Sequence, residues 1–198
     1  MQDIRLNILL PRAGAFVFNT TQAEPTPNEG KYFPVPKQGE MMQKFISYDD
    51  FTYWHLEEKS ITVSGFIAKT EYSALPKNAE ELVEMSRLDY INTPFAKNKK
   101  YVLLRWKTEA GDNIIHPFQR STMPTNELPY TNTGMTGSQY SLIPEYHVGL
   151  EAGERMVLNT AFRKGEAEAI VYNADGSIFK RYKLIGNEAT TDIEWKEK

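Results

Sequence analysis

The chain has 198 residues, a formal net charge of −3, a pI near 5.7 and no cysteine. The missing cysteines exclude disulfides, thiolate nucleophiles, iron–sulfur clusters and cysteine-based zinc sites. Duplex-binding proteins concentrate basic charge against phosphates, so double-stranded nucleic acid is not an expected partner of this acidic chain.

The chain also lacks the hydrophobic segments that membrane insertion and secretion require. No apolar run approaches the roughly 18 residues that span a bilayer, and the first residues do not form a secretory signal. We expect a soluble protein without membrane insertion, and both the cytoplasm and a virus particle stay open as locations. A hydrophobic content of 40% and a charged content of 25% fit a single globular domain over residues 1–198.

The N-terminal quarter begins with strand signals and continues into a proline-rich stretch. Alternating apolar residues from Ile4 to Leu10 predict a strand, the turn at 11–14 follows, and 15–18 would return as a second strand. Four prolines between 19 and 40 predict an irregular loop.

Two further strands are predicted before residue 70. The aromatic-rich segment 51–56 favours a strand by composition. Between Ser60 and Ala68, Val63 and Ile67 point to one face, and Gly65 indicates a bulge or a close backbone approach.

One amphipathic helix is predicted at about 78–90. Asn78 is a good N-cap, Glu81 completes a pattern like a capping box, and Leu82, Met85 and Leu88 share a face. A single helix among strands differs from the alternating pattern of doubly wound dinucleotide-binding folds.

The segment 101–108 alternates so that Val102, Leu104 and Trp106 share a face, and a turn at 109–113 predicts a hairpin with Ile114 and Ile115. The range of about 117–146 is rich in proline and glycine and is predicted to be an irregular loop.

The C-terminal part, residues 155–195, predicts an antiparallel meander. Alternation over 156–162, 167–171 and 178–184 is interrupted by turns, of which Asn173 to Gly176 is the strongest. The sequence as a whole therefore predicts an all-β, mainly antiparallel fold: a β-sandwich or a jelly-roll-like barrel with one packed helix.

No motif in the sequence carries a reaction mechanism. The histidines at 55, 116 and 147 lack metal-binding spacing, and neither a nucleophile elbow nor a phosphate-binding glycine loop is present. We therefore expect a non-enzymatic protein without catalytic residues, metal or cofactor.

The leading functional hypothesis is a structural or binding protein that acts through protein–protein contacts in a multi-copy assembly, for example a component of a virus or phage particle. Its partner would be a second copy or another protein. Arms from the long loops would make the contacts through Tyr130, Met135, Tyr140 and Tyr146.

Two alternatives remain open at this stage. Tyr53 and Trp54, with other aromatics, could stack on a sugar, as in a carbohydrate-binding module or hydrolase. A single-stranded nucleic-acid binder would use aromatics together with basic residues, namely Lys97, Lys99, Lys100 and Arg105. Burial in a core explains most aromatics more simply.

Overall fold

A computed structural model describes eleven stretches of the chain, which hold all the elements discussed below. These are residues 34–73, 75–86, 88–89, 92–109, 114–115, 135–138, 141–144, 146–148, 160–161, 166–186 and 193–198. The two strands predicted at 4–10 and 15–18, and most of the loop predicted at 19–40, lie outside these residues.

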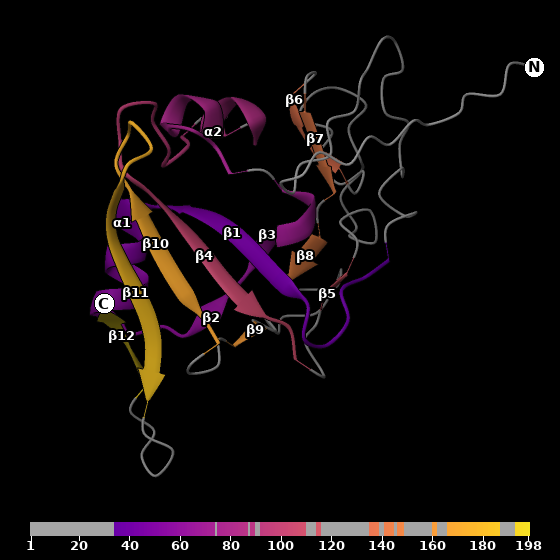
Figure 1. Ribbon diagram of the computed structural model, residues 1–198, viewed down its shortest axis with the longest axis vertical. Coiled ribbons are helices and arrows are strands. Elements are labelled where there is room, and N and C mark those ends of the chain that lie inside the picture. Colours follow the sequence, from indigo (N-terminus) through magenta and orange to yellow (C-terminus); the bar gives the residue numbers. More distant parts are fainter. Residues whose placement is uncertain are drawn as a thin grey trace, which may run out of the picture.

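An antiparallel sheet dominates the fold (Figure 1), with the strand order β12-β11-β10-β4-β1-β3-β8-β5. Its strands are β1 (Met41–Ser47), β3 (Gly65–Lys69), β4 (Tyr101–Lys107), β5 (Ile114–Ile115), β8 (Tyr146–Val148), β10 (Glu168–Tyr172), β11 (Ile178–Gly186) and β12 (Ile193–Glu197). Two small sheets pair β2 (Thr62–Val63) with β9 (Thr160–Ala161) and β6 (Met135–Ser138) with β7 (Ser141–Pro144). The helical segments are α1 (Tyr48–Asp50), the π-helix η2 (Phe51–Glu57), the 3-10 turn η3 (Thr70–Tyr72) and α2 (Ala79–Met85).

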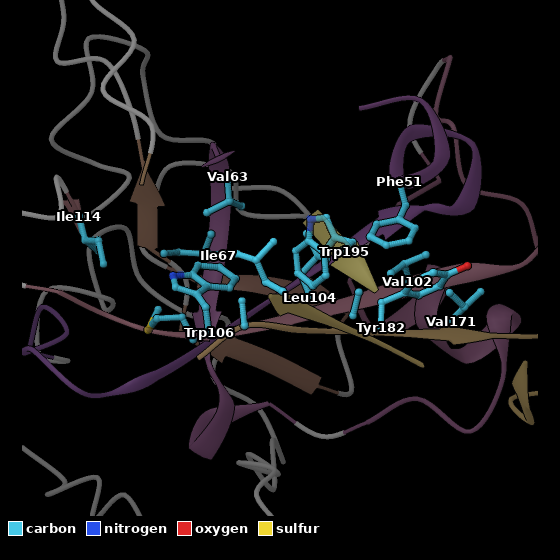
Figure 2. Close-up of a cluster of buried hydrophobic side chains, with 14 of the residues drawn as sticks. Phe51, Val63, Ile67, Val102, Leu104, Trp106, Ile114, Val171, Tyr182 and Trp195 are labelled. Carbon is cyan, nitrogen blue, oxygen red and sulfur yellow. The ribbon is translucent and has the colours of Figure 1, made fainter. Parts of the chain in front are cut away.

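The main hydrophobic core lies on one face of this sheet. Val102, Leu104 and Trp106 are buried on that face of β4, as their alternation predicts. Figure 2 shows Phe51 and Trp195 lying over the side chains of β4, β10 and β11. The fold is therefore all-β, mainly antiparallel and sandwich-like, which confirms the predicted class.

The helix α2 packs at the opposite face, where Ala79 and Leu82 form a second cluster with Tyr101. The predicted cap is confirmed, since the Oδ1 of Asn78 accepts a hydrogen bond of 2.8 Å from the Glu81 N–H. The helix ends at Met85, earlier than the predicted end near residue 90. Ser86, which follows, belongs to the residues whose side chains compete for backbone hydrogen bonds and so favour helix ends.

The strand predicted at 51–56 is wrong, because this segment is helical. The Oγ of Ser47 caps the start by accepting from the Asp50 N–H, and two aspartates occupy the first turn. Helical spacing then places Phe51 and His55 together on the buried face. Tertiary packing of this face overrides the strand preference of the aromatics.

The predicted hairpin between 101–108 and 114–115 is also wrong. Both edges of β4 are already paired, with β1 on one side and β10 on the other, and β5 pairs with β8 instead. The near-continuous burial of β4 is typical of a central strand. Because a central strand has neighbours on both sides, β4 has no free edge with which β5 could pair.

The C-terminal meander is confirmed for β10, β11 and β12, which are consecutive antiparallel neighbours. Its predicted first strand is not part of it, since β9 pairs with β2. Gly65, the first residue of β3, has a φ of +80°, which agrees with the irregularity predicted there. Inside the range 117–146, predicted to be irregular, the chain forms the β6–β7 hairpin, and Tyr146 begins β8.

Candidate binding surface

Two large aromatic side chains project into solvent from η2. Tyr53 is 49% exposed and Trp54 is 53% exposed, whereas Phe51 and His55 on the same helical segment are buried. Trp106 and Trp195, the other two tryptophans of the chain, are buried. We call Tyr53 and Trp54 the aromatic pair.

The buried side of η2 fixes the aromatic pair on a rigid base. The Phe51 ring centroid lies 5.3 Å from that of Tyr182 and 5.8 Å from that of Trp195. His55 contacts both Phe51 and Trp195 through its ring. Aromatic contacts at such separations favour a fixed geometry, so the aromatic pair is preorganised by the core beneath it.

The end of η2 is closed by backbone hydrogen bonds that involve the aromatic pair itself. The Tyr53 carbonyl accepts from the Glu58 N–H at 2.9 Å, and the Trp54 carbonyl accepts from the Ser60 N–H at 2.8 Å. The two rings meet edge to face, with centroids 4.8 Å apart and planes at 76°. The pair therefore presents a stepped apolar surface rather than one flat platform.

His55 has a structural place next to this surface. Its Nδ1 donates to the Ser60 carbonyl over 2.8 Å, which ties η2 to the segment that leads into β2. Burial lowers the pKa of His55 below its ordinary value, and the hydrogen bond to Ser60 opposes this only in part. The ring is thus held neutral near physiological pH.

A second exposed apolar site lies at the start of β11. Ile178 is 48% exposed and Phe179 is 43% exposed. The Phe179 ring meets Tyr48, the first residue of α1, edge to face at 6.4 Å. The sequence pattern did not single out these residues, because strand alternation alone does not reveal which end of a strand projects from the core.

The structure does not gather the predicted arm residues into one site. Tyr146 is fully buried in the main core, and its hydroxyl donates to the Pro34 carbonyl at 3.1 Å. Met135 opens β6, whereas Tyr130 and Tyr140 lie outside the described residues.

The predicted basic cluster is largely neutralised by carboxylates. Lys97 pairs with Glu80 at 2.8 Å, and Lys99 pairs with Asp49 at 3.3 Å. Arg105 lies on β4, with Glu168 of β10 4.0 Å away. These residues form no continuous basic stripe in the part of the chain that the structure describes.

The same part of the chain contains no group of three or more histidine, aspartate or glutamate side chains arranged to hold a metal ion. Nor does any helix within the described stretches combine the length and apolarity needed to cross a bilayer. Comparison with family models, with curated proteins and with solved structures gave no match to this chain.

Proposed function

We propose that this protein is a non-enzymatic binding protein that acts through protein–protein contacts, and that the aromatic pair is a contact surface. The observation that supports the proposal is the exposure of Tyr53 and Trp54 on a helix whose other face is locked into the core. Tryptophan and tyrosine are the residue types most enriched among the energetically dominant residues of protein interfaces.

Rigid placement strengthens this proposal on energetic grounds. A side chain that is already ordered loses little conformational freedom on association, and each immobilised flexible side chain otherwise costs about 0.5–1.5 kcal/mol. Removing the exposed apolar area of a Trp and a Tyr from water then stabilises the complex by roughly 25 cal/mol per Å².

The partner that we propose is a second copy of the chain, in a multi-copy assembly such as a virus or phage particle. A two-fold interface needs only one self-complementary surface, and the stepped aromatic pair can interlock with its own copy. Ile178 and Phe179 supply further apolar area for subunit contacts.

Light scattering over a concentration series tests the proposal. We expect the wild-type chain to associate and Trp54→Ala and Tyr53→Ala to shift association to higher concentration by about tenfold or more, as for loss of an interface hot spot. Leu75→Ala is the matched control, since Leu75 is a comparably exposed apolar residue outside the aromatic pair. A wild-type chain that stays monomeric, or variants that associate as the wild type does, would contradict the proposal.

Carbohydrate binding is the second candidate, favoured by the same exposed rings. Sugar stacking needs an open aromatic face, and the 76° angle between the planes offers the two rings in different orientations. Because Trp54 is the exposed tryptophan, its fluorescence reports directly on a ligand at this surface. Saturable quenching by soluble oligosaccharides that disappears in Tyr53→Ala would favour this candidate, and unchanged fluorescence would exclude those sugars.

A further inference from the structure

A polar hollow of about 400 Å³ lies at one end of the main sheet, away from the aromatic pair's own side chains. Three chain segments form its walls: the junction of β1 and α1, the segment that precedes β4, and the turn between β10 and β11. The lining residues are Ser47, Tyr48, Asp49, Pro94, Asn98, Lys99, Lys100, Asn173 and Ala174.

Strand register brings these three segments together. Ser47 at the end of β1 and Tyr172 at the end of β10 both pair with Tyr101, the first residue of β4. The connections that leave these three strand ends must therefore emerge side by side, at the end of the sheet that lies near α2 in Figure 1.

The wall formed by the β10–β11 turn is fixed by the helix behind it. The Ala79 N–H donates to the Ala174 carbonyl over 2.9 Å, and Gly176 packs directly against the Lys77 carbonyl. Within the turn, the Asn173 N–H donates to the Ser177 carbonyl over 2.8 Å. A hollow whose walls are held by such contacts needs little reorganisation to accept a ligand.

The charges of the hollow favour an anion. It contains two ammonium groups and one carboxylate, and Asp49 is matched by Lys99 at 3.3 Å. The Lys100 Nζ lies 4.5 Å from the ring centroid of Phe179 and 5.7 Å from that of Tyr48. No described carboxylate lies within ion-pair distance of Lys100, so its positive charge is held in place by aromatic rings and is not cancelled.

We propose that this hollow binds the oxyanion group of a small phosphorylated or carboxylated compound. Lys100 supplies the charge, Lys99 adds a second ammonium group beside its partner Asp49, and Asn98, which lines the same space, carries a side-chain amide that can donate a hydrogen bond. The side-chain amide of Asn173 already donates to the Ser177 Oγ over 3.0 Å, so this residue shapes the wall of the hollow. The hollow exceeds the size of a bare oxyanion, which fits a ligand that carries the group on a larger body.

The matched variants for a test are Lys100→Gln and Lys180→Gln. Both lysines lie over the Phe179 ring, at 4.5 Å and 5.7 Å, but Lys180 pairs with Glu197 at 2.7 Å and does not line the hollow. The two substitutions remove the same charge from neighbouring positions. Their effects on anion affinity should therefore differ only if the anion binds in the hollow. Asn98→Ala, at an exposed lining residue, is a second variant that is independent of the aromatic contacts.

The experiment is a titration of the full chain with inorganic phosphate and, separately, with acetate, followed by NMR at the backbone amides of the lining residues. Sodium chloride at equal ionic strength corrects for screening. We expect saturable shifts at these amides, with affinity reduced about tenfold or more in Lys100→Gln, reduced in Asn98→Ala and unchanged in Lys180→Gln. Stronger binding of phosphate than of acetate would assign a phosphorylated ligand, and the reverse a carboxylated one.

Two results would overturn the proposal. One is the absence of saturable shifts at the lining residues with either anion. The other is an equal loss of anion affinity in Lys100→Gln and Lys180→Gln, which would mean that the anion responds only to the overall charge of this surface. Retention of the wild-type thermal transition by Lys100→Gln shows that its loss of binding is not a loss of folding.

Discussion

The α-carbon of Gly176 lies so close to the backbone of Lys77 that a Cβ at position 176 would stand 1.7 Å from the Lys77 carbonyl oxygen. Gly176 also has a φ of +85°, in the region that side chains with a Cβ rarely adopt. The β10–β11 turn can dock against the N-terminus of α2 only because this residue is glycine.

We therefore expect Gly176→Ala to lower the free energy of unfolding by about 2–4 kcal/mol, from the left-handed backbone and the backbone clash together. Gly39→Ala is the matched control, because Gly39 has the same φ of +85° but a Cβ at this position would meet no atom within 4 Å. It should cost only about 1–2 kcal/mol. Chemical denaturation of the three proteins measures both values, and equal losses would show that the contact with Lys77 is unimportant.

The residues of this turn also show what sequence reasoning could reach. Asn173 to Gly176 was predictable as a turn, because asparagine and glycine tolerate positive φ. The approach to Lys77 was not, since it depends on where α2 lies relative to the sheet. The same limit applies to β4, whose buried face was predictable from alternation while its neighbours β1 and β10 were not.

The candidate sites were less accessible to sequence reasoning than the fold. Segment 51–56 has a strand-like composition, and only the packing of Phe51 on Tyr182 and Trp195 makes it helical. This packing decides that Tyr53 and Trp54 face solvent. The polar hollow beside Lys100 needs the register of three strands, which no local pattern specifies.

Substitutions on the two sides of η2 should differ greatly in their effect on the free energy of unfolding. Phe51→Ala removes a fully buried ring and should lower the free energy of unfolding by about 3–5 kcal/mol. Trp54→Ala removes an exposed ring and should change it by about 0.5 kcal/mol or less. Urea denaturation followed by circular dichroism gives both numbers, and a large loss in Trp54→Ala would show that its ring stabilises the fold instead of being available to a partner.

Tyr146 is expected to act through the core. Tyr146→Phe keeps the buried ring and removes the hydroxyl that donates to the Pro34 carbonyl, so it should cost about 1 kcal/mol. Tyr146→Ala should cost about 3–5 kcal/mol. If Tyr146→Phe weakened association in light scattering without any loss in the free energy of unfolding, a contact role for its hydroxyl would follow instead.

The cap of α2 gives a test of local helix stability. Asn78→Ala removes the acceptor of the Glu81 N–H and should lower the free energy of unfolding by about 1 kcal/mol, whereas Asn78→Asp keeps an acceptor and should restore most of it. Thermal denaturation of the two variants beside the wild type measures this difference. A loss in Asn78→Asp equal to that in Asn78→Ala would show that the side-chain oxygen at this position does not cap the helix.

The buried ring of His55 makes stability depend on pH. Burial lowers the pKa of His55 in the folded chain below the value of 6.5 expected when the chain is unfolded. Below that value the unfolded chain therefore binds the proton more readily, and the free energy of unfolding must fall as the pH decreases from 6.5. Above 6.5 both states leave the ring neutral, and this contribution is constant.

His55→Asn tests this linkage, since an asparagine amide can still donate a hydrogen bond toward Ser60 but does not titrate. We expect the wild type to lose stability between pH 7 and about pH 5 and the variant to lose less over the same interval. Carboxylates whose pKa is lowered in the folded chain, such as Glu40, lose their contribution to stability only as the pH falls below their ordinary pKa of 4.5. Parallel denaturation curves for the two proteins over this interval would mean that another group carries the pH dependence.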